Sequence, residues 1–205
     1  MPVPDFDHNG VLPPHLGDPT DLTRLSPYPV SPVELCTKLG TTWERRAILS
    51  GLLNLRESLR TLQFTECFQW IDGSFMEDCE ARRGRAPNDV DVVTFGRYSQ
   101  VPVDPALAAI IRDHQQTKAQ YRVDHFTVNL NWQSSALVEQ ARYWALLFSH
   151  SRGDSLWKGM VRLELGTAAG DDLARQALAA QAAPAPVNPT PPPAPPAPGN
   201  QAPPP

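Results

Sequence analysis

Short runs rich in β-branched and aromatic residues constrain the fold of this chain most, because such residues favour extended backbone. Val90–Phe95 is dense in valine and too short to favour a helix. Tyr121–Trp132 alternates between apolar and polar side chains, as a strand with two different faces does. Together with Cys67–Asp72 and Trp157–Leu165, these runs predict a β-sheet.

Helical patterns precede the strands and lie between them. Residues 42–63 carry leucine and isoleucine at spacings of three and four, which predicts a long amphipathic helix. Shorter helices are expected over 31–40, 104–118 and 135–149, each beginning at a Ser or Asp that can cap the first turn. The resulting order of elements indicates an α/β (α+β) fold with a small mixed β-sheet and flanking helices.

Proline divides the chain into parts. Residues 1–30 contain several proline and glycine turns and are expected to form an extended N-terminal arm. The globular domain follows over residues 31–166, and residues 167–183 are an Ala-rich helix or linker. Residues 184–205 hold twelve of the chain's 23 prolines, so this tail is predicted to be disordered and is a candidate segment for binding a partner protein.

Charge and cysteine content argue against several classes of protein. The formal net charge is -4, which disfavours a duplex nucleic-acid binder. The three cysteines lack the spacing of a zinc site or a redox motif and fit buried thiols in a reducing compartment. Neither a membrane-length apolar run nor a secretory signal is visible, so we expect a cytoplasmic protein with no membrane partner.

Acidic residues stand at the start of two predicted strands. Asp89 and Asp91 are two residues apart, so they project from one side of the sheet, and that side continues as the apolar Val93. Asp124 has the same relation to Phe126 in the next strand. Carboxylates that meet beside an apolar face need a proton, a cationic side chain or a metal ion. Oxygen ligands suit Mg2+ (or Mn2+), which makes Asp89, Asp91 and Asp124 candidate metal ligands.

A tight turn closes the first of these strands. Gly73 lets the backbone approach a phosphate, and Ser74 adds a hydroxyl and an amide donor. Gly73 and Ser74 are therefore candidate nucleotide-binding residues. Lys158, between Trp157 and Gly159, is a further candidate for contact with a phosphate or base, or else a turn residue that leads into the last strand.

A strand, Gly73-Ser74, a loop and a strand bearing Asp89-Val90-Asp91, with Asp124 on a later strand, resemble the polymerase-beta-like nucleotidyltransferase superfamily. The chain is also similar to a family of bacterial proteins of unassigned function within that fold. Three motifs carry this second resemblance, which spans roughly residues 10 to 166: Gly10-Val11-Leu12-Pro13-Pro14, Asp72-Gly73-Ser74-Phe75 and Trp157-Lys158-Gly159. The interval between Gly-Ser and Asp-x-Asp, which includes residues 77–85, is longer here than in compact members of the superfamily.

The superfamily resemblance implies two-metal nucleotidyl transfer. Asp89 and Asp91 would hold metals that bind a nucleoside triphosphate, and Asp124 would help to activate a hydroxyl of an unidentified acceptor, which could be RNA, protein or a small molecule. Stand-alone relatives of this fold suggest a role in bacterial toxin-antitoxin or phage-defence systems. The alternative is a catalytically inactive nucleotide- or protein-binding module with the same fold.

Simpler interpretations of the charged residues stay open. Asp89 and Asp91 could face solvent at the entry of a strand, or pair with Arg82, Arg83 or Arg85. These arginines could also steer a phosphate-bearing substrate. Charged loops are usually solvated surface, and we favour that interpretation for the arginines.

Overall fold

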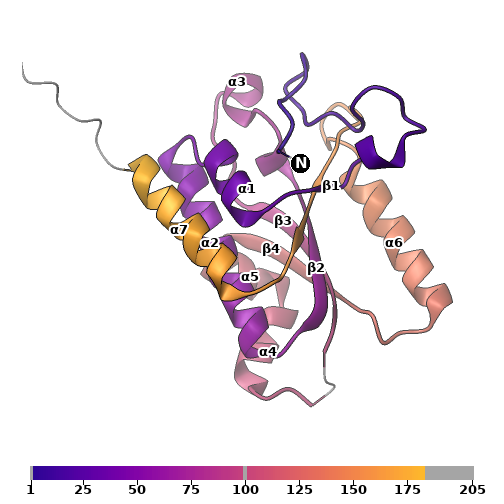
Figure 1. Cartoon of the computed structure of the whole chain (residues 1–205), viewed down its shortest axis with the longest axis vertical. Helices are drawn as coiled ribbons and strands as arrows, with labels where there is room; N and C mark the ends of the chain where they lie inside the picture. The colour runs from indigo at the N-terminus through magenta and orange to yellow at the C-terminus, as the bar shows by residue number, and fades with distance from the viewer. Residues whose placement is uncertain (1, 99–100, 183–205) are drawn as a thin grey trace, which may run out of the picture.

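One mixed sheet forms the centre of the protein. The computed structural model describes residues 2–98 and 101–182, and within them the strand order is β1-β5-β2-β3-β4 (Figure 1). β3 pairs in parallel with β4 and β1 with β5, whereas β2 is antiparallel to both of its neighbours. The predicted α/β fold with a small mixed sheet is confirmed. The strands are β1 Tyr28–Pro29, β2 Thr65–Asp72, β3 Val90–Arg97, β4 Val123–Asn129 and β5 Val161–Glu164.

Helices cover the two faces of the sheet unequally. In Figure 1 most helices lie to one side of the sheet, where α7 packs along α1 and α2, and α6 lies alone on the other side. The helices are α1 Pro32–Leu39, α2 Trp43–Thr61, α3 Cys79–Arg83, α4 Pro105–Arg112, α5 His114–Tyr121, α6 Ser134–Phe148 and α7 Ala168–Ala182.

Each face of the sheet buries its own apolar core. The larger core joins α1, α2 and α7 to strand residues that include Ile71 and Val92. The smaller core lies under α6, where Val93 of β3 meets Trp144 and Phe148. Because side chains alternate along a strand, the odd-numbered residues of β3 belong to the α6 face.

The helix expected over 104–118 is in fact two helices. Asp113 leaves the helical conformation at a φ of -103° and a ψ of 104°, which ends α4. Its carboxylate then accepts hydrogen bonds from the amides of Gln115 and Gln116, so it caps α5. The helical pattern of residues 104–118 did not reveal this break, because Asp113 caps a new helix within an otherwise helical run.

Other boundaries also differ from those expected. β4 and β5 are shorter than the runs 121–132 and 157–165, and α3 was not expected. The N-terminal arm contains a 3-10 turn, Leu22–Arg24, and contributes β1 to the sheet edge. Within the Ala-rich segment 167–183, Ala168–Ala182 form α7, whereas residue 183 and the tail 184–205 lie outside the described residues.

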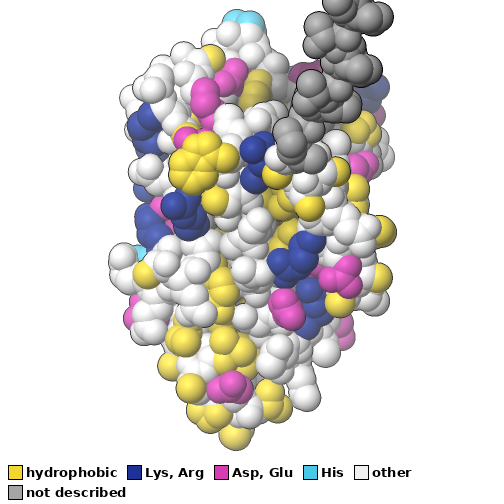
Figure 2. Space-filling model, turned by 90° about the vertical axis from the view of Figure 1, so that its left-hand side faces the viewer, with side chains coloured by type: hydrophobic (Ala, Val, Ile, Leu, Met, Phe, Trp, Pro, Cys, Tyr) yellow, Lys and Arg dark blue, Asp and Glu magenta, His cyan; other side chains and the backbone are white. Residues whose placement is uncertain are grey.

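The outer surface of the helical layer carries both signs of charge. Figure 2 shows Lys and Arg side chains close to Asp and Glu side chains on this face, with hydrophobic areas between them. That mixture agrees with the small net charge of the chain. In the part of the chain that the structure describes, no helix is long and apolar enough to cross a membrane.

Candidate functional site

Aspartates from three adjacent strands form a row at one end of the α6 face. Asp72 at the end of β2 pairs in register with Asp91 in β3, and Asp91 pairs in register with Asp124 in β4. Paired residues point to the same face, so the three side chains lie side by side with Val93 behind them. Asp89 stands two residues before Asp91 and shares its side. The structure thus brings together the three carboxylates chosen from the sequence and adds Asp72.

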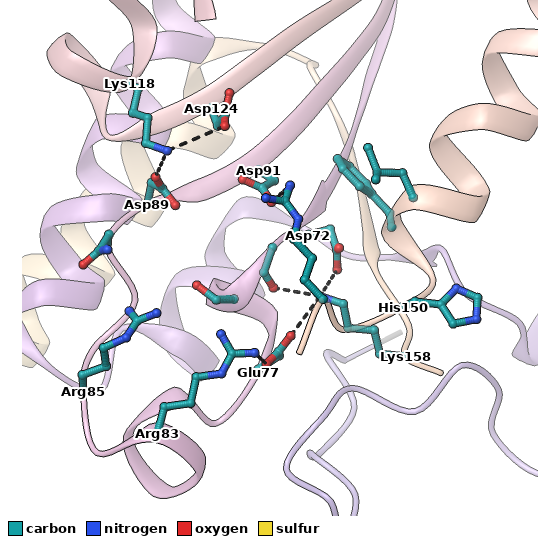
Figure 3. A pocket seen from close by; sticks show the side chains of 16 residues that line it. Asp72, Glu77, Arg83, Arg85, Asp89, Asp91, Lys118, Asp124, His150 and Lys158 are labelled. Atoms are coloured by element: carbon teal, nitrogen blue, oxygen red, sulfur yellow. Dashed lines mark hydrogen bonds and ion pairs between the residues drawn. The ribbon is translucent and has the colours of Figure 1, made fainter. Parts of the chain in front are cut away.

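The Gly73 turn lies against this row. Gly73 has a left-handed φ of 84°, and a Cβ there would come within 2.8 Å of the Asp91 carboxyl group. Any other residue would strain the turn and displace that carboxylate. Ser74 follows as the first residue of a 3-10 turn and lines the same pocket, which has a volume of about 240 Å³ (Figure 3). Apart from Leu147 and Phe148, the residues that line this pocket are polar, charged or glycine.

Two cationic side chains partner the carboxylates. Lys118 of α5 places Nζ 2.6 Å from Oδ2 of Asp89 and 3.7 Å from Oδ2 of Asp124 (Figure 3). The hydrogen bond with Asp89 raises the pKa of Lys118. On the other side, Nη2 of Arg152 lies 3.8 Å from Oδ2 of Asp91. Burial raises the pKa of Asp91; Arg152 opposes this rise, and the neighbouring carboxylates add to it.

The oxygen atoms of these carboxylates are the type of ligand that a hard divalent cation prefers. Asp89, Asp91 and Asp124 offer carboxylate oxygens, and their side chains are between 16% and 19% exposed, so a cation from solvent can reach them. In this conformation no three His, Cys, Asp or Glu side chains of the described residues are gathered so that they could hold a metal ion. The carboxylates instead share the ammonium of Lys118 and the guanidinium of Arg152.

Lys158 is buried and supports the turn from within the protein. Its Nζ donates to the carbonyl oxygen of Gly73 at 2.9 Å and lies 3.0 Å from Oδ1 of Asp72 and 3.3 Å from Oε1 of Glu77. The ammonium thus hydrogen-bonds the turn and forms ion pairs with two buried carboxylates. Burial raises the pKa of Asp72 to about 7 even though Lys158 lowers it. In this conformation the Lys158 side chain, 2% exposed, holds the turn in place.

The arginines after the turn divide into two groups. Arg82 and Arg83 both pair with Glu77, whose side chain is 2% exposed, and Arg82 also pairs with Asp154 at 2.5 Å. For Arg82, whose side chain is 14% exposed, the interpretation as solvated surface is wrong, whereas Arg83 is exposed although it also pairs with the buried carboxylate. Arg85 is exposed and donates to the carbonyl oxygen of Ala86, in agreement with that interpretation. Arg83 and Arg85 also line the pocket.

Sequence reasoning did not select Asp72 or Lys118 as site residues. Asp72 could have been found by alternation, because it lies two residues after Trp70 on the apolar side of its strand. Lys118 gave no such signal. It reaches Asp89 only because α4 ends at Asp113 and α5 packs against β4.

Comparison with known proteins identifies a family match that covers the whole site. A family model described as "Family of unknown function (DUF6932)" matches residues 4–164, which include all five strands and every residue of the pocket. No curated protein and no solved structure matches the chain.

Proposed function

We propose that this chain, which belongs to the DUF6932 family of unknown function, is a metal-dependent nucleotidyltransferase-like protein that transfers a nucleotide from a nucleoside triphosphate to an acceptor. The observation that carries the proposal is the register of three strands. It aligns Asp91 with Asp124, and Asp91 lies against a turn that only glycine can form. This arrangement supports a site for a divalent cation and phosphates.

Each residue of the site has a role in this proposal. Asp89, Asp91 and Asp124 would hold Mg2+ (or Mn2+), which when bound neutralises phosphate charge. The amides of the Gly73–Ser74 turn would donate to phosphate oxygens, since the missing side chain of Gly73 permits a close approach. Asp124, at the edge of the row, would accept the proton of the acceptor hydroxyl. Lys158 serves the nucleotide indirectly, because it fixes the carbonyl of Gly73.

Lys118 is expected to compete with the cation for the carboxylates. The substitution Lys118→Met removes the positive charge beside Asp89 and Asp124, and we expect it to tighten Mg2+ binding about three- to tenfold in the absence of nucleotide. Isothermal titration with MgCl2 measures the change. Lys38→Met, which removes an exposed lysine paired with Asp5, is the matched control and should change nothing. Weaker Mg2+ binding in Lys118→Met would contradict this competition.

The central test of the proposed function is binding of nucleoside triphosphates. We expect wild type to bind at least one of the four triphosphates in the presence of Mg2+, and Asp89→Ala/Asp91→Ala to bind it about a hundredfold more weakly, because the cation loses two ligands. The exposed pair Asp18→Ala/Asp21→Ala, which caps only its own turns, is the control. Equal binding by wild type and the Asp89/Asp91 variant would exclude the metal site.

A catalytically inactive module that binds nucleotide or protein is the second candidate. It is favoured by the pairing of Lys118 and Arg152 with the three carboxylates, which offsets part of their charge without a metal ion. Release of pyrophosphate from the bound triphosphate, assayed with RNA, protein and small-molecule acceptors, distinguishes the two. Metal-dependent binding of a triphosphate without release of pyrophosphate supports the inactive module. Either candidate is compatible with a role in toxin-antitoxin or phage-defence systems.

A further inference from the structure

A second pocket adjoins the first and differs from it in chemistry. It has a volume of about 490 Å³ and lies between the N-terminal arm, the end of α6 and the segment before β5. Most of its lining is apolar or aromatic, and this lining includes Pro27, Trp70, Leu146, Trp157 and Met160. Nothing in the proposed chemistry of the carboxylate row uses this pocket.

The two pockets are neighbours on the same face of the sheet. His150 and Lys158 line both of them. β2 pairs with β5 through Ile71 and Val161, so Met160, which lines the second pocket, lies beside Asp72, which lines the first. A ligand with a charged part at the carboxylate row can therefore extend past Lys158 into an apolar compartment.

The second pocket offers the surfaces that a planar heteroaromatic ring requires. Trp157 is 58% exposed, and among the described residues its indole meets the ring of His15 edge-on at 6.1 Å. Nε1 of Trp70 is buried and has no hydrogen-bond partner among the residues described, so it is a donor without an acceptor. A nucleobase has two apolar faces, which can stack on the exposed indole of Trp157.

We propose that this second pocket takes the nucleobase of the triphosphate, with Trp157 as its stacking surface. The inference rests on the proposed function, because the phosphates have to lie at the Gly73–Ser74 turn. The first pocket contributes Leu147 and Phe148 as its apolar residues and otherwise presents charge, which suits phosphates and a cation better than a base. The base therefore occupies the adjoining compartment.

The test compares a nucleotide with its phosphates alone. Isothermal titration in Mg2+ uses the four nucleoside triphosphates and inorganic tripolyphosphate on wild type and Trp157→Ala. We expect the variant to bind the preferred triphosphate about tenfold more weakly, and tripolyphosphate as wild type does. Leu146→Glu, which puts a charge on the part of the lining that α6 contributes, should show the same pattern. Trp43→Ala removes a tryptophan that is 64% exposed at the start of α2, and it should change the affinity for neither ligand.

Each other outcome overturns the inference in a recognisable way. Unchanged triphosphate binding in both Trp157→Ala and Leu146→Glu would place the base elsewhere while leaving the proposed function intact. Equally weakened binding of the triphosphate and of tripolyphosphate would show that the pocket does not bind the base. If wild type binds neither ligand, the proposed function fails together with the base pocket.

Discussion

The substitution Lys158→Met is expected to lower the free energy of unfolding by about 3 kcal/mol or more at pH 8, and by clearly less at pH 5. The side chains of Lys158, Asp72 and Glu77 are all at most 4% exposed, so water cannot replace the lost ammonium. Glu77 keeps Arg82 and Arg83 as partners, whereas Asp72 has no second cationic partner among the residues that the structure describes. The cost therefore falls mainly on the charge of Asp72 and on the carbonyl of the glycine turn.

The pH dependence follows from the direction of the pKa shift. Burial raises the pKa of Asp72 to about 7 in the folded protein, against about 3.9 in an unfolded chain. A carboxyl group whose pKa is raised favours the folded state below the unfolded pKa, and this stability is lost as pH rises through the folded pKa. Lys158 lowers the pKa of Asp72, so its removal raises that pKa further. At pH 5 Asp72 is protonated in both proteins, whereas at pH 8 only wild type can hold it ionised beside a cation.

Urea unfolding of wild type and variant at pH 5 and pH 8 measures both parts of this prediction. Lys118→Met is the matched control, because Lys118 also pairs with two carboxylates but is 44% exposed. We expect it to change stability by about 1 kcal/mol or less at either pH. A loss in Lys158→Met that is the same at both pH values would show that Asp72 does not control it.

The parts of the site that depend on short-range geometry were predictable from the sequence. Asp89 and Asp91 share a side because they are two residues apart on extended backbone, and Gly73 was recognised as a turn because of its residue type. Strand pairing carries no such local signal. The alignment of Asp91 with Asp124 requires the parallel pairing of β3 with β4, which depends on how the intervening helices pack.

Long-range contacts explain what the sequence did not reveal. Lys158 was a candidate for direct phosphate contact, yet the structure buries it between Asp72 and Glu77, residues far from it along the chain. Arg82 was expected at the surface for the same reason, since its buried partner Glu77 could not be recognised as buried from its type. Charged residues that satisfy one another inside a fold look like surface residues in a sequence.

A buried chain of hydrogen bonds links α2 to the strand that carries Asp124. Nη1 of Arg56 donates to Oε1 of Gln69 at 2.7 Å, and Nε2 of Gln69 donates to Oγ1 of Thr94 at 3.1 Å. The Thr94 hydroxyl then lies 2.8 Å from Nε2 of His125. Burial lowers the pKa of His125 to about 4, so the ring is neutral at pH 7. Its Nδ1 lies 3.2 Å from the carbonyl oxygen of Ile111 and donates to it, so Nε2 accepts from Thr94. This series of hydrogen bonds reaches β4 at His125, the residue after Asp124, and stabilises the position of that strand.

Arg56 also ties α7 to the domain. Its Nε lies 2.9 Å from Oδ1 of Asp171, and its Nη2 donates to the carbonyl oxygens of Glu164 and Leu165 at 2.9 Å. The side chains of Arg56 and Asp171 are 1% and 2% exposed. Asp171 lies beyond residue 164, where the family match ends, so this ion pair joins the matched region to the helix that follows it.

The substitution Arg56→Met is therefore expected to destabilise the protein by about 2 to 4 kcal/mol, because the buried amide of Gln69 and the carbonyl oxygen of Glu164 lose their donor. The buried carboxylate of Asp171 then keeps only Arg60, whose Nη2 lies 2.6 Å from its Oδ2. Thermal and urea unfolding measure the loss. Arg175 of α7 is 35% exposed and pairs with Glu57 of α2. The substitution Arg175→Met should lower the free energy of unfolding by about 1 kcal/mol or less. Arg56→Met/Asp171→Leu should recover part of the stability, since the apolar pair removes a buried carboxylate that would otherwise keep only the partly exposed Arg60 as its cation. A double variant no more stable than Arg56→Met would assign the loss to Gln69 and the carbonyls instead of to Asp171.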